Sequence, residues 1–165
     1  NPWMQESSNK IIQSGEIVSF DTDMVGPYGY CADISRAFVE GNKFNDEQKK
    51  LYSMAVDQIN HNYRIIKPGV SFKEFTERSW TLPDEYYGNR YSVMLHGIGM
   101  CDEWPAIRYP TDGGQRNGQF EKNMTITLES YIGKVGGKEG VKLEQQYLVG
   151  ENGLELMSHH PLEDI

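Results

Sequence analysis

The chain has 165 residues, about the size of one domain, and 38% of them are hydrophobic, which is enough apolar material for a folded core. Its 24 acidic and 16 basic residues give a formal net charge of −8, which argues against electrostatic binding to nucleic acid or anionic membranes. No apolar run reaches the roughly 20 residues of a membrane span, and two cysteines cannot build a disulfide framework. We therefore expect a single domain over residues 1–165 in the reducing cytoplasm.

The first half of the chain predicts a hairpin followed by a long helix. Residues 16–23 alternate in polarity as a strand does, and residues 28–38 resume the alternation after the turn signal Gly26-Pro27. Asn45 is a typical N-cap for a helix from residue 46 to about residue 66, where Lys67-Pro68-Gly69 would end it.

The second half predicts a short helix and several strands. Ser71 with Glu74 matches a capping box that opens the helix. Residues 82–110 lack periodicity, so we expect mostly loop around a short strand at residues 91–95. Alternation returns in three stretches, which read as antiparallel strands: residues 124–129, 141–147 and 154–156. Together these elements indicate an α+β domain.

The hairpin concentrates acidic residues. A turn centred on Pro27 would place Asp21 opposite Asp33 and Asp23 opposite Cys31, with all three carboxylates on one face. Carboxylates directly opposite one another destabilise a sheet, and burial would raise their pKa values unless a cation intervenes. A divalent metal is the simplest such cation. The alternative is a solvent-facing hairpin whose acids are only hydrated, and the hairpin alone does not decide between the two.

Three later residues complete an oxygen-rich set. His96 lies in the Gly-rich stretch Leu95-His96-Gly97-Ile98-Gly99, and Glu129 and Glu144 lie on predicted strands. Taken singly, each would be an ordinary core or surface residue. Taken with the three aspartates, they could hold two divalent ions such as Mn, Fe(II), Co or Zn. The scarcity of cysteine argues against a Cys-rich structural zinc site.

The order of these residues resembles the pita-bread metallopeptidase superfamily, which includes methionine aminopeptidase, aminopeptidase P, prolidase and the non-metal creatinase. The matching motifs are an Asp on one strand, Asp33-Ile34-Ser35-Arg36, then His96-Gly97-Ile98-Gly99, then two glutamates. The resemblance implies a curved antiparallel sheet with flanking helices. It also implies a set of metal ligands: Asp21, Asp33, His96, Glu129 and Glu144.

The resemblance covers most of the chain but corresponds only to the C-terminal part of a family catalytic domain. The opening Asn1-Pro2-Trp3-Met4 is not a natural start. We therefore expect the chain to have been cut from a longer protein, with the family's N-terminal domain absent here.

Three stretches depart from the peptidase pattern. Phe20-Asp21-Thr22-Asp23 stands where peptidases have Asp-Xaa-Gly, and Glu129-Ser130-Tyr131 stands where they have Glu-Pro-Gly. Cys101-Asp102-Glu103-Trp104-Pro105 replaces the stretch in which peptidases carry a second His that stabilises the tetrahedral intermediate. These departures argue against peptide-bond hydrolysis.

One branch of the superfamily, the dimethylsulfoniopropionate (DMSP) lyases, resembles the chain across the whole run from Phe20 to Arg36. This resemblance implies β-elimination of DMSP to dimethyl sulfide and acrylate by a homodimer from marine bacteria. It implies two divalent ions, with iron (Fe) as the metal and Mn, Zn or Co as alternatives, and Asp23 as a further ligand. It also implies Asp102 as the base and Tyr91 beside the substrate.

Other interpretations remain open at this point. Without the resemblance, Asp102 is more readily a loop acid that caps a turn than a base. Arg36 is either a partner that holds a ligand carboxylate or a surface cation. The protein could also be a prolidase-like or Xaa-Pro hydrolase that retains the metal site. A catalytically silent binding module is a third hypothesis, but such a module has no physical need to keep mutually repelling acids together.

Overall fold

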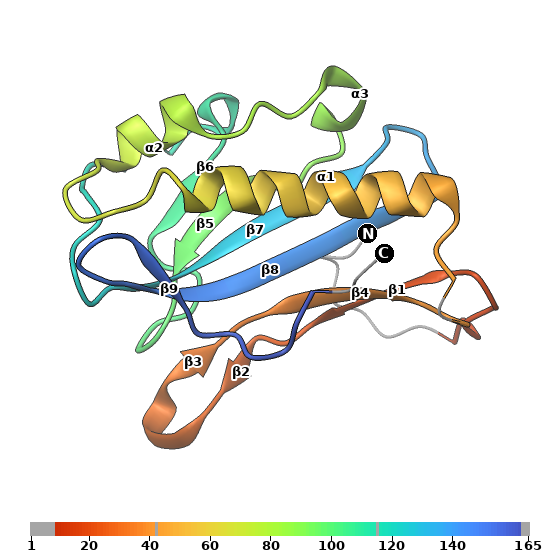
Figure 1. The fold of residues 1–165 in the computed structure, drawn as a ribbon, viewed down its shortest axis with the longest axis horizontal. Helices are drawn as coiled ribbons and strands as arrows, with labels where there is room; N and C mark the ends of the chain where they lie inside the picture. The colour runs from red at the N-terminus through yellow and green to blue at the C-terminus, as the bar shows by residue number, and fades with distance from the viewer. Residues whose placement is uncertain (1–8, 42, 115, 163–165) are drawn as a thin grey trace.

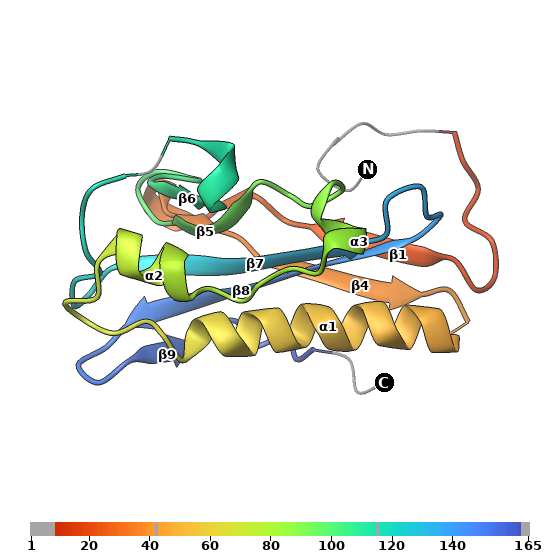
Figure 2. The ribbon, with the colours of Figure 1, turned by 90° about the horizontal axis from the view of Figure 1, so that it is seen from above.

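The computed structural model describes residues 9–41, 43–114 and 116–162. The opening Asn1-Pro2-Trp3-Met4 lies outside these residues. Figures 1 and 2 show a long helix, α1, lying along the two long strands β7 and β8, with the β1–β4 pair on the side of these strands away from the helix. In the described part of the chain, no helix is long and apolar enough to cross a membrane.

The main sheet has five antiparallel strands in the order β6-β5-β7-β8-β9. Their bounds are β5 Val93–Gly97, β6 Ala106–Arg108, β7 Thr125–Gly133, β8 Gly140–Val149 and β9 Leu154–Leu156. The register places Glu129 opposite Glu144 and His96 opposite Thr127. Because residues directly opposite one another share a face of the sheet, all four side chains project from the same face.

The hairpin forms two short ladders. β1 (Ile17–Asp21) pairs with β4 (Ser35–Val39), and β2 (Met24–Val25) pairs with β3 (Cys31–Ala32) around the 3-10 turn η1 (Pro27–Gly29).

The predicted register of this hairpin is wrong. Asp21 lies opposite Ser35 instead of Asp33, and Val25 instead of Asp23 lies opposite Cys31. The physical reason is the turn. It is centred on Tyr28, which takes a positive φ of 62°, so the centre lies one residue beyond Pro27.

The helices follow their capping signals. α1 runs over Asp46–Tyr63, and the side chains of Asn45 and Gln48 cap its start reciprocally. It ends three residues before the predicted limit of about residue 66. α2 covers Phe72–Arg78, and its N-cap Ser71 accepts a hydrogen bond from the N–H of Glu74 at 3.0 Å, as expected.

The stretch over residues 82–110 is more ordered than the sequence predicts. It contains a one-turn helix, α3 (Asp84–Tyr87), and the strands β5 and β6, and the short 3-10 turn η2 (Pro110–Asp112) follows. The predicted strand at residues 91–95 begins two residues later and ends at Gly97. One helical turn and a three-residue strand are too short to produce a periodic pattern.

Both faces of β7 and β8 are buried. Leu128 and Ile132 face α1 and join its buried stripe in the core. On the same face, Ser130 Oγ donates to Gln58 Oε1 of α1 at 2.7 Å. The opposite face carries Glu129 and Glu144, which are also buried, so these are not the half-buried strands that alternation predicts. The sheet therefore holds acidic side chains in the interior, between β7–β8 and the hairpin.

Candidate metal centre

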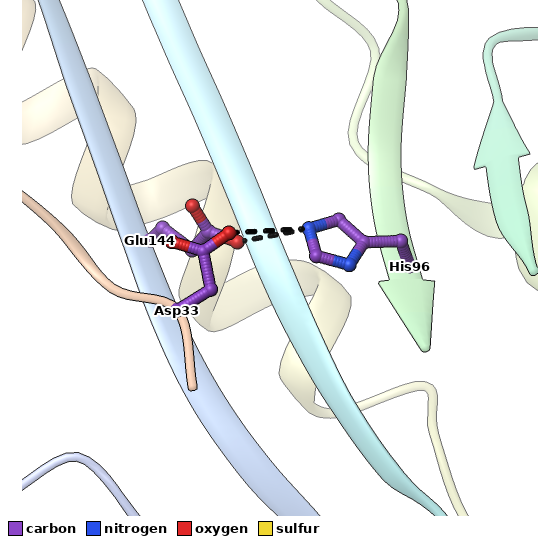
Figure 3. Close-up of side chains that lie close together, drawn as sticks. All are labelled: Asp33, His96 and Glu144. Carbon is purple, nitrogen blue, oxygen red and sulfur yellow. Dashed lines mark hydrogen bonds and ion pairs between the residues drawn. The ribbon is translucent and has the colours of Figure 1, made fainter. Parts of the chain in front are cut away.

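Carboxylates from three separate parts of the chain meet one imidazole. Asp33, His96 and Glu144 offer ligand atoms that lie within 4.8 Å of one another, and Figure 3 shows the two carboxylates facing the His96 ring. Asp21, Asp23 and Asp33 form a second group of the same kind. The two groups share Asp33.

His96 directs one ring nitrogen at the acids. Its Nε2 lies 3.1 Å from Glu144 Oε1, 3.4 Å from Glu129 Oε1 and 3.8 Å from Asp33 Oδ2. Its Nδ1 lies 3.0 Å from the carbonyl oxygen of Gly97. When the ring is neutral, donation from Nδ1–H to this carbonyl would leave the Nε2 lone pair available to a metal ion, which is the arrangement of a metal-ligating histidine.

The three aspartates of the hairpin are held together by local contacts. Ser35 Oγ donates to Asp21 Oδ1 at 2.5 Å, across the ladder in which the two residues are opposite. The backbone N–H of Asp23 donates to Asp33 Oδ1 at 3.3 Å. The carboxylates thus converge as the sequence predicts, although the pairing that brings them together is different.

Sequence analysis missed Lys142, which lies inside the acid cluster. Its Nζ is 2.8 Å from Glu129 Oε2, 2.9 Å from Glu144 Oε2 and 3.8 Å from Asp21 Oδ2, and it donates to Ser35 Oγ at 3.0 Å. The sequence contains a signal for this position, because Lys142 stands two residues before Glu144 and residues at this spacing share a face of a strand.

The electrostatics of the metal-free cluster favour an added cation. Burial, with repulsion from Glu144, raises the pKa of Asp33 to about 8, and burial raises the pKa of Glu129 to about 7. Burial would also raise the pKa of Glu144, but the ammonium of Lys142 and the His96 ring outweigh it and lower that pKa to about 2. The two flanking acids are thus held partly protonated, and a dication would release their protons.

The donor set fits a divalent metal. Glu129 Oε1 is buried with no hydrogen-bond partner, yet it lies 3.4 Å from His96 Nε2. Carboxylate oxygens with one imidazole suit first-row dications. The unpaired oxygen would gain a partner from an ion placed beside His96, which would remove the cost of burying it alone.

Tyr91, predicted to lie beside the substrate, is next to the cluster. Its ring centroid is 5.5 Å from Lys142 Nζ, and its hydroxyl donates to Glu103 Oε1 at 3.4 Å. Burial, followed by the nearby charge of Glu129, raises the pKa of the Tyr91 hydroxyl. Tyr91 therefore links the acid cluster to the segment that follows β5.

Asp102, the predicted base, lies in that segment. Its Oδ1 accepts a hydrogen bond from the N–H of Glu103 at 3.1 Å, which agrees with the turn-capping interpretation and leaves its second oxygen for other contacts. Trp104 is 56% exposed and stacks against Arg116, whose guanidinium carbon is 3.6 Å from the ring centroid. A base role for Asp102 stays a prediction.

Arg36 has neither of the roles that the sequence suggests. It is buried, so it is not a surface cation, and it holds main chain instead of a ligand carboxylate. Its guanidinium donates to the carbonyl oxygens of Glu144 at 2.6 Å and Ser35 at 2.8 Å, and to Gln145 Oε1 at 2.5 Å. Arg36 thereby fastens β4 to β8 directly behind the cluster.

The antiparallel sheet, its covering helix and the buried cluster of acids and histidine define the pita-bread class of folds. The model of metallopeptidase family M24 matches residues 1–151, and the chain belongs to this family. The fold is shared with an X-Pro aminopeptidase from Thermotoga maritima (27% identical, TM-score 0.76, covering 97% of this chain and 44% of that one). It is also shared with a prolidase from Pyrococcus horikoshii (26% identical, TM-score 0.80, covering 96% of this chain and 44% of that one).

Among curated proteins, the chain is 40% identical to the dimethylsulfoniopropionate lyase DddP of Roseovarius nubinhibens, over 99% of this chain and 37% of the relative. It is 37% identical to the enzyme of the same name from Roseobacter denitrificans, with the same coverage. An Xaa-Pro dipeptidase from Pyrococcus horikoshii is 32% identical over 89% of this chain and 40% of the relative. The chain thus spans about two fifths of the length of these proteins.

Proposed function

We propose that this protein is a metal-dependent carbon–sulfur lyase that converts DMSP to dimethyl sulfide and acrylate. The observation that carries the proposal is the segment after β5, which presents Asp102 and Glu103 beside Tyr91 where a peptidase is expected to present a histidine. The 40% identity with a DMSP lyase over nearly the whole chain supports the same reading.

The proposed centre holds two divalent ions. Its ligands would be the six side chains predicted from the sequence: Asp21, Asp23, Asp33, His96, Glu129 and Glu144. The sharing of Asp33 between the two ligand groups supports this number. We propose iron as the metal, with Mn, Zn or Co as alternatives, because the same oxygen and imidazole donors accept each of them. When bound, the ions would supply Lewis-acid stabilisation of charge on the substrate carboxylate.

The chain's own residues would handle the proton. Asp102 would remove a proton from the carbon next to the substrate carboxylate. The electron pair of that C–H bond becomes the new C=C bond of acrylate, and the C–S bond breaks with its pair going to sulfur. Dimethyl sulfide leaves neutral, and the proton stays on Asp102. Tyr91 would face the sulfonium, because an aromatic ring attracts a cation by roughly 0.5 to 2 kcal/mol.

The test is headspace detection of dimethyl sulfide from the intact protein, loaded anaerobically with Fe(II) and given DMSP. We expect metal-dependent release that falls at least about 100-fold in Asp102→Ala. A matched control is Glu77→Ala, which removes an exposed acid that pairs with Lys73 on α2 and should leave release unchanged. No gas from protein verified to contain metal would contradict the lyase proposal.

The second candidate is a prolidase-like metallopeptidase. The 32% identity with an Xaa-Pro dipeptidase favours it, as does the shared fold with prolidases. Hydrolysis of Xaa-Pro dipeptides by the same metal-loaded preparation, without release of dimethyl sulfide, would establish this alternative in place of the lyase.

We further propose that the chain is the C-terminal part of a larger catalytic domain and that the protein is a cytoplasmic homodimer. The partial coverage of its relatives supports the first statement. The free thiols of Cys31 and Cys101 agree with a reducing compartment. Light scattering coupled to size exclusion would measure the mass of the intact protein, and a monomer would contradict the dimer.

A further inference from the structure

The two glutamates of the cluster divide their oxygens between two positive groups. Oε1 of both Glu129 and Glu144 faces His96 Nε2, at 3.4 and 3.1 Å. Oε2 of both faces Lys142 Nζ, at 2.8 and 2.9 Å. The ammonium therefore sits on the opposite side of the carboxylate pair from the imidazole. It contacts the Oε2 atom of each glutamate, while the Oε1 atoms face His96.

The ammonium of Lys142 is buried and surrounded by oxygen atoms. Lys142 is 2% exposed, and Ser35 Oγ and Asp21 Oδ2 complete its oxygen surroundings at 3.0 and 3.8 Å. A buried ammonium is stable only when such partners replace its water. In return, its charge is what allows two glutamates to stand directly opposite each other on β7 and β8, an arrangement that otherwise destabilises a sheet.

The charge balance gives Lys142 a second consequence. The five clustered carboxylates carry five negative charges when ionised, and the single charge of Lys142 leaves four. Two divalent ions would neutralise these. Because Lys142 Nζ contacts two of the ligand carboxylates, its charge would oppose the binding of a dication to the same carboxylates as well as stabilise the metal-free site.

We propose that Lys142 is a built-in counter-cation of the metal centre, which holds Glu129 and Glu144 in their metal-binding arrangement while the centre lacks metal and weakens the hold on metal once it is loaded. This inference rests on the proposed metal site. Lys142 is a positioning residue in this scheme, because it acts on the reaction only through the ligands.

The test compares the intact protein with Lys142→Met, which keeps the length of the side chain and removes the charge, and with Lys142→Arg, which keeps the charge. Lys122→Met is the matched control, because Lys122 pairs with Glu151 on the surface. Melting temperatures are measured after metal removal and again with saturating Mn²⁺, and Mn²⁺ affinity is measured by calorimetry.

We expect Lys142→Met to lower the melting temperature of the metal-free protein by at least about 5 °C, since it leaves buried carboxylates unpaired. Mn²⁺ should recover more than half of this loss and should bind at least about tenfold more tightly than to the unsubstituted protein, because the opposing charge is gone. Lys142→Arg should lose less than half as much stability, and Lys122→Met should match the unsubstituted protein.

Several outcomes would overturn the inference. An unchanged melting temperature without metal would remove the stabilising role of Lys142. Weaker Mn²⁺ binding by Lys142→Met would show that its charge does not oppose the metal. A variant that is unfolded both with and without Mn²⁺, as judged by circular dichroism, would also contradict it, because a dication should replace the missing charge. Absence of Mn²⁺ binding to the unsubstituted protein would refute the metal centre itself, and the metal-free melting comparison would still decide the stabilising role.

Discussion

His96 Nε2 lies 3.1 Å from Glu144 Oε1, although the two residues belong to strands that are not neighbours. β7 runs between β5 and β8, so the contact passes over the middle strand on the face that carries Glu129. One ring therefore ties together three strands of the sheet. A change in the charge of His96 or of Glu144 would therefore alter the contacts among β5, β7 and β8.

Asp33 belongs to both candidate ligand groups. We expect Asp33→Asn to abolish binding of at least one ion per chain, because an amide oxygen carries no charge to offset the desolvation of a dication. Elemental analysis of the intact, metal-loaded protein gives the ratio of metal to protein. Asp57→Asn, at an exposed position of α1, is the control. An unchanged ratio in Asp33→Asn would refute its assignment as a ligand.

The stability of the metal-free protein should fall as pH rises from about 5.5 to about 8.5. Folding raises the pKa of Asp33 to about 8, of Glu129 to about 7 and of His96 to about 10, where the hydrogen bond and charge of Glu144 outweigh burial of the ring. Each group binds its proton more tightly in the folded state, so its contribution is present at low pH and is lost as pH rises through the folded value. Glu144, with a pKa lowered to about 2, does not titrate in this window.

Melting temperatures of the EDTA-treated protein across this range measure the effect. Saturating Mn²⁺ should remove or reverse the trend, because metal binds the deprotonated carboxylates and competes with protons. A melting temperature that rises with pH in the absence of metal would contradict the predicted titration.

Arg36 should be needed to hold β4 against β8. Arg36→Met would leave the carbonyl oxygens of Ser35 and Glu144 buried without their donors, at a cost of about 3 kcal/mol. Arg36→Lys should lose an intermediate amount, because an ammonium cannot reproduce the fork of the guanidinium. Urea unfolding measures both. Equal stability of the methionine variant and the unsubstituted protein would show that the contacts carry no net energy.

At Gly97 the segment bearing Asp102 comes back against β5, where the N–H of Gly97 donates to the carbonyl oxygen of Pro105 at 3.0 Å. A Cβ on Gly97 would lie 2.2 Å from the carbonyl oxygen of Trp104, and main chain cannot move aside as a side-chain tip can. We expect Gly97→Ala to destabilise the protein by about 2 kcal/mol.

The control for this substitution is Gly88→Ala. The added Cβ would meet only a methyl group of Val135, at 3.1 Å, and φ at Gly88 is −70°. It should stay within about 0.5 kcal/mol of the unsubstituted protein. Urea unfolding measures the stability of both variants. Equal values would show that the segment bearing Asp102 moves aside without cost.

Sequence patterns predicted the long helix and the long strands well. Asn45 and the stripe of Leu51, Ala55 and Ile59 identify α1, because caps and helical spacing are local signals. The α+β class followed from the predicted strands and helices and the pita-bread class from the order of the motifs, and the family match and the solved structures confirm the pita-bread class. The clustering of Asp21, Asp23, Asp33, His96 and Glu144 could be expected from the sequence because their types and order resemble a known ligand set, and their role as ligands stays a prediction.

The predictions that were wrong or missing depend on geometry that no local sequence pattern encodes. The hairpin register depends on whether the turn is centred on Pro27 or on Tyr28. A difference of one residue in this centre changes every opposing pair. Lys142 was missed because a lysine on an alternating strand ordinarily points to water, and only the packing of the hairpin against β8 buries it. Arg36 was misjudged for the same reason.

The candidate ligands come from distant parts of the chain, since residues 21–33, 96 and 129–144 meet only after the hairpin has reached β8 and β5 has paired with β7. Contacts between such remote positions form late, once the entropy of closing the long loops has been overcome. We therefore expect the unfolded chain to hold no preformed ion site and metal binding during refolding to report the last stage of assembly. Stopped-flow mixing with Co²⁺ would record that moment as the appearance of ligand-field absorbance.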